Sequence, residues 1–233
     1  MKTVAIVPAR SGSKRLSNKN IKMLAGKPLV VWTLEACINS KYVDQVIFST
    51  DSEDYWQLVS QYIKSDKLTL SLRTAEEAGD KVKIFDYIKS NFRTIFPFDT
   101  THFLLALPTM PLREHTHINE AIELSLDKDL GVFSAVEYDA PISFAFYQSD
   151  DTHWEAAFES CPMNTGNTRS QDQKTAYHPN GAIYYLPLSS LENEHLMSFY
   201  QGATPYIMDR KQSVDIDTET DFRMAEILLN ELS

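Results

Sequence analysis

The sequence predicts an α/β fold, with a Rossmann-like, doubly wound, mostly parallel sheet in a single domain of residues 1–233 that carries a small antiparallel insertion. Short β-branched, apolar runs alternate with segments of helical period through the first half of the chain, which is the pattern of βαβ units. The first run, residues 3–7, indicates a strand buried on both faces of a parallel sheet. A length of 233 residues and a hydrophobic content of 43% suit one core.

The first half of the chain should contain four strands, each followed by a helix. Pro28 suits the first position of a helix, where a missing N–H costs little, and Ser52 suits an N-cap. Because parallel strands end at one edge of a sheet, ligands are expected at that edge. We expect strands at 3–7, 45–50, 68–72 and 102–107, and helices at 28–40, 52–64, 80–92 and 116–126.

The alternation stops after a strand at 131–136. Strands are expected at 142–147 and 181–186, with a polar, turn-rich stretch and no strong helix between them. We therefore predict an antiparallel segment inserted at 137–200, which would expose apolar strands unless it joined two subunits in a homodimer. A strand at 203–208 and a helix at 217–232 complete the domain.

Composition excludes several classes of protein. A formal net charge of −10 repels polyanions, so we expect no nucleic acid partner. The apolar run at the N-terminus is too short for a membrane span or a signal segment, so we expect no membrane partner. Cys37 and Cys161 form no metal-binding spacing, which favours free thiols and a cytoplasmic location.

A basic loop follows the first strand. The first acidic residue of this acidic chain is Glu35, and small residues in the loop can turn backbone N–H groups toward an anion. Neither the dinucleotide nor the P-loop glycine fingerprint is present. A solvated basic turn is the alternative, but the position after a buried strand favours a triphosphate site. The residues concerned are Arg10, Ser11, Gly12, Ser13, Lys14, Lys19 and Asn20.

Two acids stand close together near the C-terminus. If the segment 213–218 is extended, Asp215 and Asp217 share one face while the residue between them is buried. Such a pair suits Mg²⁺, which binds one or two carboxylates together with phosphate oxygens and water. The alternative is that Asp217 or Thr218 caps the last helix, with Asp221 completing a capping box.

Three short runs near the start have a specific pattern: Ala9-Arg10-x-Gly12-Ser13-Lys14, Lys19-Asn20 and Leu24-Ala25-Gly26-Lys27-Pro28-Leu29. Together they resemble the N-terminal signature of the CMP-sialic acid synthetase (acylneuraminate cytidylyltransferase) family. The resemblance implies a nucleotidyltransferase domain in which this loop binds the triphosphate and cytosine of CTP. It assigns nucleotide binding to Ala9, Arg10, Gly12, Ser13, Lys14, Lys19, Asn20 and Arg73.

The same resemblance extends to the second half of the chain. It makes Asp215 and Asp217 the metal ligands, and Asn180 and Tyr184 substrate-binding residues on a segment beside the sugar site. It also implies Arg169, Leu107 and Phe199 as substrate contacts, with Phe199 contributed by the partner subunit. This sequence departs from the family pattern at Leu107, where a glutamine is usual, at Ser143, where a lysine is usual, and at Lys83, near an expected serine.

The reaction implied by the resemblance is transfer of CMP from CTP to the anomeric hydroxyl of a nonulosonic, sialic-acid-like sugar, with release of pyrophosphate. Arg10, Lys14 and Asp215 would be the catalytic residues, acting by position and charge together with Mg²⁺. Two alternatives stay open. One is a cytidylyltransferase for another acidic acceptor, such as an eight-carbon sugar acid or a phosphonate, and the other is an inactive nucleotide-binding module.

Overall fold

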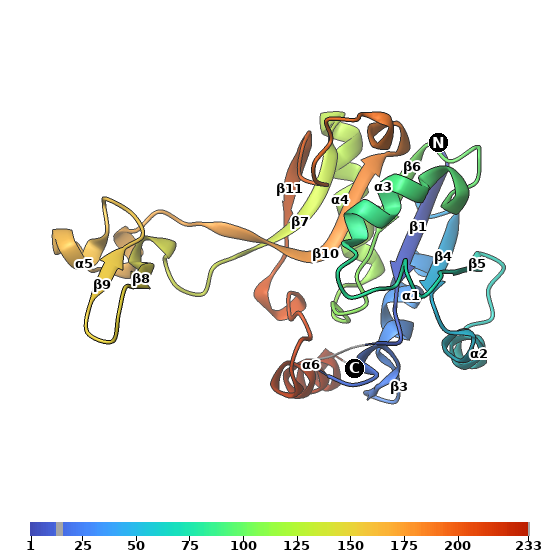
Figure 1. The fold of residues 1–233 in the computed structure, drawn as a ribbon, viewed down its shortest axis with the longest axis horizontal. Helices are drawn as coiled ribbons and strands as arrows, with labels where there is room; N and C mark the ends of the chain where they lie inside the picture. The colour runs from blue at the N-terminus through green and yellow to red at the C-terminus, as the bar shows by residue number, and fades with distance from the viewer. Residues whose placement is uncertain (13–15, 233) are drawn as a thin grey trace.

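A computed structural model describes residues 1–12 and 16–232 (Figure 1). Its centre is a seven-stranded sheet in the order β11-β7-β10-β6-β1-β4-β5. All neighbouring pairs are parallel except those of β10, which runs antiparallel to both β6 and β7. The strands are β1 (Thr3–Pro8), β4 (Gln45–Thr50), β5 (Leu68–Leu72), β6 (His102–Leu105), β7 (Gly131–Glu137), β10 (Tyr177–Pro187) and β11 (Ala203–Ile207).

The helices that connect the strands and cover both faces of the sheet are α1 (Leu29–Asn39), α2 (Glu53–Tyr62), α3 (Ile84–Ile95) and α4 (His115–Lys128). The short α5 (Pro162–Thr165) lies away from the sheet (Figure 1), and α6 (Glu219–Leu232) packs against Leu24 and Leu29. Two small hairpins pair β2 (Met23–Leu24) with β3 (Lys27–Pro28), and β8 (Phe146–Gln148) with β9 (Trp154–Ala156). Short 3₁₀ helices are η1 (Lys19–Ile21), η2 (Ile142–Phe144), η3 (Ser170–Asp172), η4 (Leu188–Glu192) and η5 (Arg210–Gln212). Within the described part of the chain, every helix is too short or too polar to cross a bilayer.

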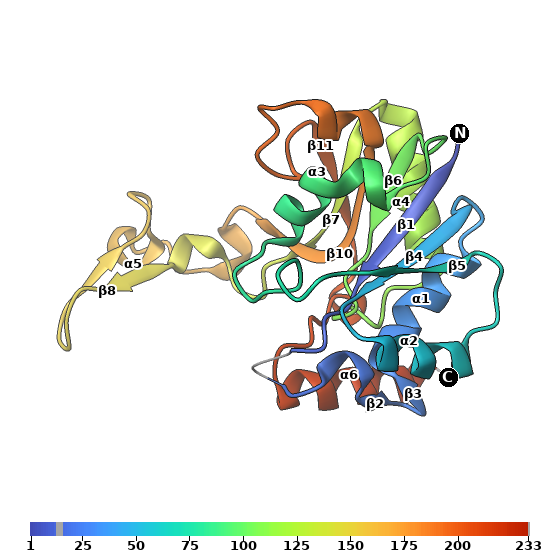
Figure 2. The same cartoon turned by 45° about the vertical axis from the view of Figure 1, so that its right-hand side comes forward.

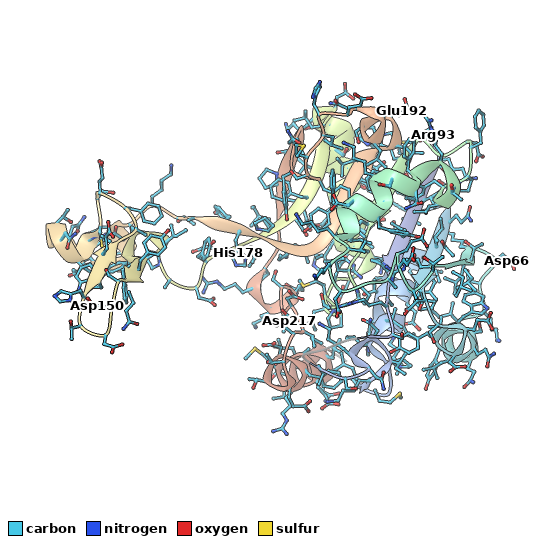
Figure 3. All side chains as sticks on the ribbon, in the orientation of Figure 1. Asp66, Arg93, Asp150, His178, Glu192 and Asp217 are labelled. Atoms are coloured by element: carbon cyan, nitrogen blue, oxygen red, sulfur yellow. The ribbon has the colours of Figure 1, made fainter. Side chains whose placement is uncertain are left out.

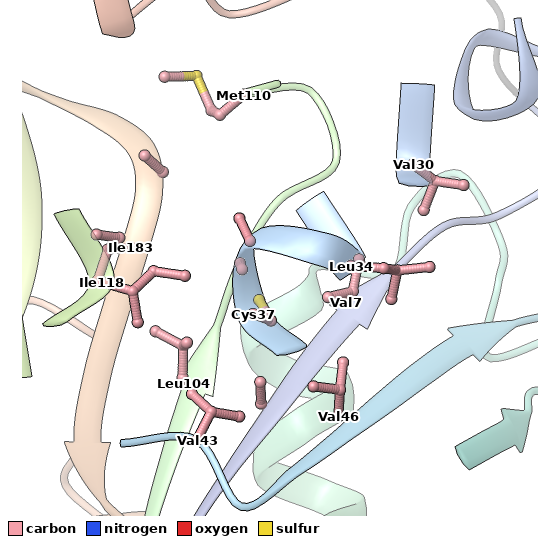
Figure 4. Packing of buried hydrophobic residues seen from close by; sticks show 14 of the residues in the cluster. Val7, Val30, Leu34, Cys37, Val43, Val46, Leu104, Met110, Ile118 and Ile183 are labelled. Atoms are coloured by element: carbon pink, nitrogen blue, oxygen red, sulfur yellow. The ribbon is translucent and has the colours of Figure 1, made fainter. Parts of the chain in front are cut away.

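Two apolar layers confirm the doubly wound α/β architecture. One lies between the sheet and α1, α2 and α4, and includes Val7, Leu34 and Ile118 (Figure 4). The other lies on the opposite face, where α3 and the chain after η4 cover β6 with Ile88 and Phe199. The sheet is therefore buried on both sides, as the apolar run of the first strand predicts.

Several predicted elements are confirmed to the residue. The strands at 45–50 and 68–72 have the predicted bounds, and the Ser52 hydroxyl accepts a hydrogen bond from the Tyr55 N–H (3.3 Å) as the N-cap of α2. Thr218 and Asp221 form the predicted capping box, so α6 starts at Glu219 rather than at 217. The prediction that Pro28 takes the first helical position is wrong by one residue, because Pro28 is the N-cap and α1 begins at Leu29.

Three predicted elements are wrong in part. The helix predicted at 80–92 begins only at Ile84, because residues 80–83 form a turn and an extended N-cap. The strand predicted at 142–147 starts with a 3₁₀ helix after Pro141, whose φ of −57° favours a turn, and only Phe146–Gln148 is a strand. The strand predicted at 181–186 is longer, since Gly181 (φ 81°) supplies the bulge that lets β10 continue on both sides.

The predicted insertion divides into an arm and a part of the central sheet. Residues 138–176 project away from the body of the molecule, carrying β8, β9 and α5 (Figures 1 and 2). β10 and η4, by contrast, belong to the sheet and its cover. The arm exposes large apolar side chains, namely Tyr138, Phe146, Tyr147, Trp154, Phe158 and Met163.

Cys37 lies in the apolar layer under α1, fully buried, and this burial raises the pKa of its thiol from 9.0 to about 11. The unfolded chain therefore releases this proton at a lower pH than the folded chain, and stability falls as pH rises from 9 to 11. The expected loss from this group is about 2–3 kcal/mol. Urea unfolding at several pH values should show a shallower decline for Cys37→Ala than for the wild type. An equal decline in both would contradict this assignment.

Candidate active site

A cavity of about 450 Å³ lies at the carboxyl ends of β1 and β6. We call it the first cavity. Its walls come from four places: the loop after β1, the turn before α3, the loop after β6 and the segment before α6. Asp217, which is labelled in Figure 3, belongs to the last of these. The lining residues are Pro8, Arg10, Leu16, Lys19, Asn20, Asp80, Leu107, Pro108, Thr109 and Asp217.

The basic side chains of the first cavity are held by acids and by backbone carbonyls. Arg10 forms an ion pair with Asp80. The Lys19 ammonium contacts the Asp217 carboxylate (3.1 Å) and donates to the Ile216 carbonyl (2.5 Å). The buried Asn20 amide donates to the Arg10 carbonyl (3.0 Å) and so fixes the start of the loop. Three predicted nucleotide-binding residues, Arg10, Lys19 and Asn20, are thus brought together.

Three more residues predicted to bind the nucleotide, Ala9, Gly12 and Arg73, lie beside the first cavity. Ala9 is fully buried and donates its N–H to the Ser49 carbonyl (2.8 Å), as a continuation of β1. A side chain at Gly12 would meet nothing within 4 Å, so the backbone is accessible there. Arg73 is buried behind the loop, where it donates to the Ser49 carbonyl (3.3 Å), and burial lowers its pKa. Ser13 and Lys14 lie outside the described residues.

The two acids predicted to bind a metal are close neighbours in space. Ile216 between them is fully buried, whereas Asp215 is exposed and Asp217 is half-buried. Surrounding protein still desolvates the Asp215 carboxylate, and this raises the pKa of Asp215. The negative charge of Asp217 raises this pKa further, whereas the hydrogen bond with the Thr109 side chain and the positive charge of Lys19 lower it. Among the described residues, no three His, Cys, Asp or Glu side chains form a cluster that could hold a metal alone. The pair therefore suits a cation that is shared with phosphate oxygens.

A second cavity of about 450 Å³ adjoins the first, and Leu107 lines both. It is mostly apolar and lies between α3 and β10. Its polar groups include Lys83 and the hydroxyls of Tyr184 and Tyr200, which lie 3.1 Å apart. Burial strongly raises the pKa of Tyr184, so its hydroxyl stays protonated at neutral pH. The lining residues are Lys83, Ile84, Phe85, Asp86, Lys89, Leu105, Leu107, Tyr184, Leu196, Met197, Ser198, Phe199 and Tyr200.

Phe199 lines this cavity from its own chain. It is 5% exposed and its ring packs on those of Phe85 (4.8 Å between centroids) and Tyr184 (5.6 Å). Phe199 reaches this cavity within its own chain, and a contribution from a partner subunit stays a prediction. The chain reverses after η4, and this reversal brings the residue back over β6.

Three other residues singled out in the sequence lie outside both cavities. Asn180 is 6% exposed and its amide donates to the Ser213 hydroxyl (3.0 Å), so it ties β10 to the segment that leads to Asp215. Arg169 lies in the exposed arm, next to Asp172 (3.7 Å). Ser143 is also in the arm, where its hydroxyl donates to Gln173 (3.0 Å). Within one chain, the arm residues do not join the site.

Sequence reasoning missed three residues of the site: Asp80, Thr109 and Tyr200. Asp80 contacts Arg10 and Tyr200 contacts Tyr184, which are distant in the chain, so no local pattern marks them. Thr109 could have been found, because it stands in the segment Pro108-Thr109-Met110-Pro111 that directly follows a predicted strand. Loops at that position border the ligand edge of a parallel sheet.

Asp80 should compete with an anionic ligand for Arg10. Because this ion pair is exposed, we expect Asp80→Asn to tighten binding of CTP, the nucleotide that the sequence resemblance implies, about two- to fivefold and to make that binding more sensitive to salt. Isothermal titration calorimetry with CTP at two ionic strengths measures both effects. Glu192→Gln, which removes the partner of Arg93 elsewhere on the surface, is the matched control. Weaker CTP binding by Asp80→Asn would show that Asp80 helps the ligand.

Two solved structures share this fold. CMP:2-keto-3-deoxy-manno-octonic acid synthetase complexed with CTP superposes with a TM-score of 0.72 at 14% identity, covering 100% of both chains. The 4-diphosphocytidyl-2C-methyl-D-erythritol synthase of Anaerococcus prevotii gives 0.66 at 13% identity, covering 98% of this chain and 96% of that one. At such identities the likeness shows the fold alone, which is a Rossmann-like α/β fold.

The family is shown by the sequence. The family model described as cytidylyltransferase matches residues 4–229, and this chain belongs to the cytidylyltransferase family. N-acylneuraminate cytidylyltransferase of Escherichia coli O18:K1:H7 is 37% identical over 96% of this chain and 51% of its own length. Pseudaminic acid cytidylyltransferase of Campylobacter jejuni is 29% identical, over 98% of this chain and 96% of its own. The chain thus spans about half the length of the N-acylneuraminate relatives that it matches. These relatives confirm the resemblance to the CMP-sialic acid synthetase family.

Proposed function

We propose that this protein transfers CMP from CTP to the anomeric hydroxyl of a nonulosonic acid and releases pyrophosphate. The observation that carries the proposal is the pair of adjoining cavities, one with cations and an acid pair, the other mostly apolar, with Leu107 between them. Two reactants held in such neighbouring sites gain much of the rate advantage that position alone provides. The relatives named for N-acylneuraminate, pseudaminic acid and N,N′-diacetyllegionaminic acid support this class of acceptor.

In this proposal the first cavity binds CTP. Arg10 and Lys19 contact its phosphates, Asn20 holds the loop in place, and Lys14 adds a further cation. The acceptor occupies the second cavity beside Tyr184. Its anomeric oxygen attacks the α-phosphorus, a new oxygen–phosphorus bond forms, the bond to the β-phosphate oxygen breaks, and pyrophosphate leaves. The hydroxyl proton passes to solvent. Because the acceptor attacks the phosphorus directly, no covalent enzyme intermediate is needed.

Asp215 and Asp217 fit a shared Mg²⁺. Asp217 lines the first cavity, and Asp215 interacts with Asp217, Thr109 and Lys19, so the pair offers two carboxylate donors that phosphate oxygens and water would complete. When bound, Mg²⁺ neutralises charge on the phosphates. Lys19 forms an ion pair with the Asp217 carboxylate and so keeps it oriented toward the cavity.

A panel of acceptors tests the proposed function. N-acetylneuraminate, pseudaminic acid, legionaminic acid and the eight-carbon 2-keto-3-deoxy-manno-octonate are each incubated with CTP and Mg²⁺, and pyrophosphate release is followed. We expect release with at least one nine-carbon acid. Turnover of the eight-carbon acid alone would favour a different cytidylyltransferase. Tight CTP binding with no release from any acceptor would favour an inactive nucleotide-binding module.

We also propose that the arm joins two copies in a homodimer. A cavity of about 1010 Å³, lined largely by apolar groups such as Phe133, Phe158 and Tyr177, lies between the arm and the sheet. Together with the exposed aromatic residues of the arm, it offers an apolar surface that a second copy can cover. Arg169 reaches a substrate in this proposal only from the partner's arm. Light scattering at micromolar concentration should give the dimer mass, and a monomer would overturn the idea.

A cytoplasmic location belongs to the same proposal. Both cysteines are free and buried, which suits a reducing compartment, and CTP is made there. Fractionation of cells that produce the tagged protein should find it with cytoplasmic markers.

A further inference from the structure

The side chain of Arg113 is buried without an acidic partner in the described part of the chain. It is 1% exposed, and its Nη1 donates to the carbonyls of Ala182 (3.0 Å) and Leu107 (3.3 Å). Its Nε and Nη2 have no hydrogen-bond partner among residues 1–12 and 16–232. A buried cation of this kind is costly, and replacing it by an apolar side chain of similar volume often leaves stability unchanged or improved. Arg113 therefore needs a reason other than stability.

The two carbonyls that Arg113 holds belong to the boundary between the two cavities. Leu107 lines both cavities. Ala182 directly follows the bulge of β10, and a side chain at Gly181 would lie 3.2 Å from the Leu107 Cδ1 atom. Arg113 thus fixes the end of β6 and the bulge of β10 against one another from behind the cavity wall.

The loop that ends at Arg113 also holds the segment that carries the acids. The Ile216 N–H donates to the Thr109 carbonyl (2.9 Å), which places Asp215 and Asp217 on either side of this contact. Backbone hydrogen bonds from Arg113 to Met110 (3.3 Å) and from Met110 to Leu107 (3.4 Å) close the loop. One short loop therefore touches the acceptor wall at one point and the acid pair at another.

We propose that Arg113 is a positioning residue for CMP transfer, which it serves by fixing the Leu107 carbonyl and hence the distance between the acceptor wall and the acid pair. This inference rests on the proposed function. In-line attack requires the acceptor oxygen and the α-phosphorus to be aligned, and a displacement of about 1 Å can lower the rate about 10²-fold. Arg113 touches neither reactant and acts through Leu107 and Ala182.

Three substitutions separate positioning from core packing. Arg113→Met keeps the unbranched stem but removes both hydrogen bonds, whereas Arg113→Lys keeps the charge and one donor. Thr33→Val removes another hydrogen bond to the same Leu107 carbonyl, which the Thr33 hydroxyl donates (3.4 Å). The control is Thr100→Val. The Thr100 hydroxyl is buried, has no hydrogen-bond partner among the described residues, and lies two residues before β6.

The experiment measures kcat and KM from pyrophosphate release, the Kd of CTP by calorimetry, and the melting temperature of each variant. For Arg113→Met we expect a kcat about 10²-fold lower, a KM and Kd for CTP within about threefold of the wild type, and a melting temperature that is unchanged or higher. The kcat of Arg113→Lys should be at least about tenfold higher than that of Arg113→Met. The kcat of Thr33→Val should be about three- to tenfold lower than that of the wild type, and the kcat of Thr100→Val should be unchanged.

Several outcomes would overturn the inference. One is Arg113→Met with wild-type kcat, and another is a melting temperature that falls while kcat per folded molecule is kept, as core packing alone would give. Where Arg113→Met does not fold, wild-type kcat in both Arg113→Lys and Thr33→Val would decide against it. A wild-type protein that turns over no acceptor sinks the proposed function itself, which is a different result from active wild type with unaffected variants.

Discussion

Asp215→Asn should lower CTP turnover by about 10²–10³-fold while the protein stays folded. The substitution keeps the size of the side chain but removes the negative charge that a hard cation needs, and Asp217 alone would then hold it. Asp215 is exposed, so loss of its charge should not destabilise the fold. The measurement is pyrophosphate release as a function of Mg²⁺ concentration, with the Mg²⁺ requirement of the variant shifted upward.

Asp66→Asn is the matched control for this prediction. Asp66 is exposed and lies on the far side of the molecule from Asp217 in Figure 3. The Asp66→Asn variant should turn over CTP like the wild type at every Mg²⁺ concentration. Wild-type turnover by Asp215→Asn would refute a metal role for the pair and would leave Asp217 with its other contacts, to Lys19 and to the capping box of α6.

Arg10→Ala should reduce kcat/KM for CTP by about 10²-fold. The substitution removes a cation from the first cavity and leaves Asp80 there without this partner, so a lost attraction and a new repulsion act together. The double substitution Arg10→Ala, Asp80→Ala should therefore recover part of the loss. Initial rates at varied CTP, with circular dichroism to check folding, give the comparison.

Arg93→Ala is the control for Arg10→Ala, since Arg93 is an exposed arginine that pairs with Glu192 (3.5 Å) away from either cavity. We expect no change in its kinetics. If the double variant were as slow as Arg10→Ala alone, then Asp80 would not oppose the triphosphate, and the tighter CTP binding expected of Asp80→Asn should fail as well.

The parts of the fold that could be predicted from the sequence are those set by local pattern. The buried strands 45–50 and 68–72 are bounded by turn residues and have no competing interpretation, and Ser52 and Thr218 mark helix starts by their side-chain chemistry. The start of α3 was misplaced because residues 80–83 have helical composition but form a turn beside Arg10.

The candidate site shows the same division. Arg10, Lys19, Asn20 and the acid pair could be found because charge and spacing mark them in the sequence. The structure brings Arg10, Lys19, Asn20 and Asp217 to one cavity. Contacts across the sheet could not be found in this way. Neither the Tyr184–Tyr200 pair nor the place of Phe199 follows from any periodicity, because both depend on how the chain returns over β6 after η4.

The antiparallel strand β10 has a consequence for how this chain is made. β10 lies between β6 and β7, yet it is synthesised after both of them. On the ribosome, β1, β4, β5 and β6 can pair first, but the open edge of β6, with Phe103 and Leu105, must wait for β10. At about 5–20 residues per second this wait is on the order of ten seconds. Protection of this nascent edge from intermolecular pairing is therefore a requirement for efficient production of the protein.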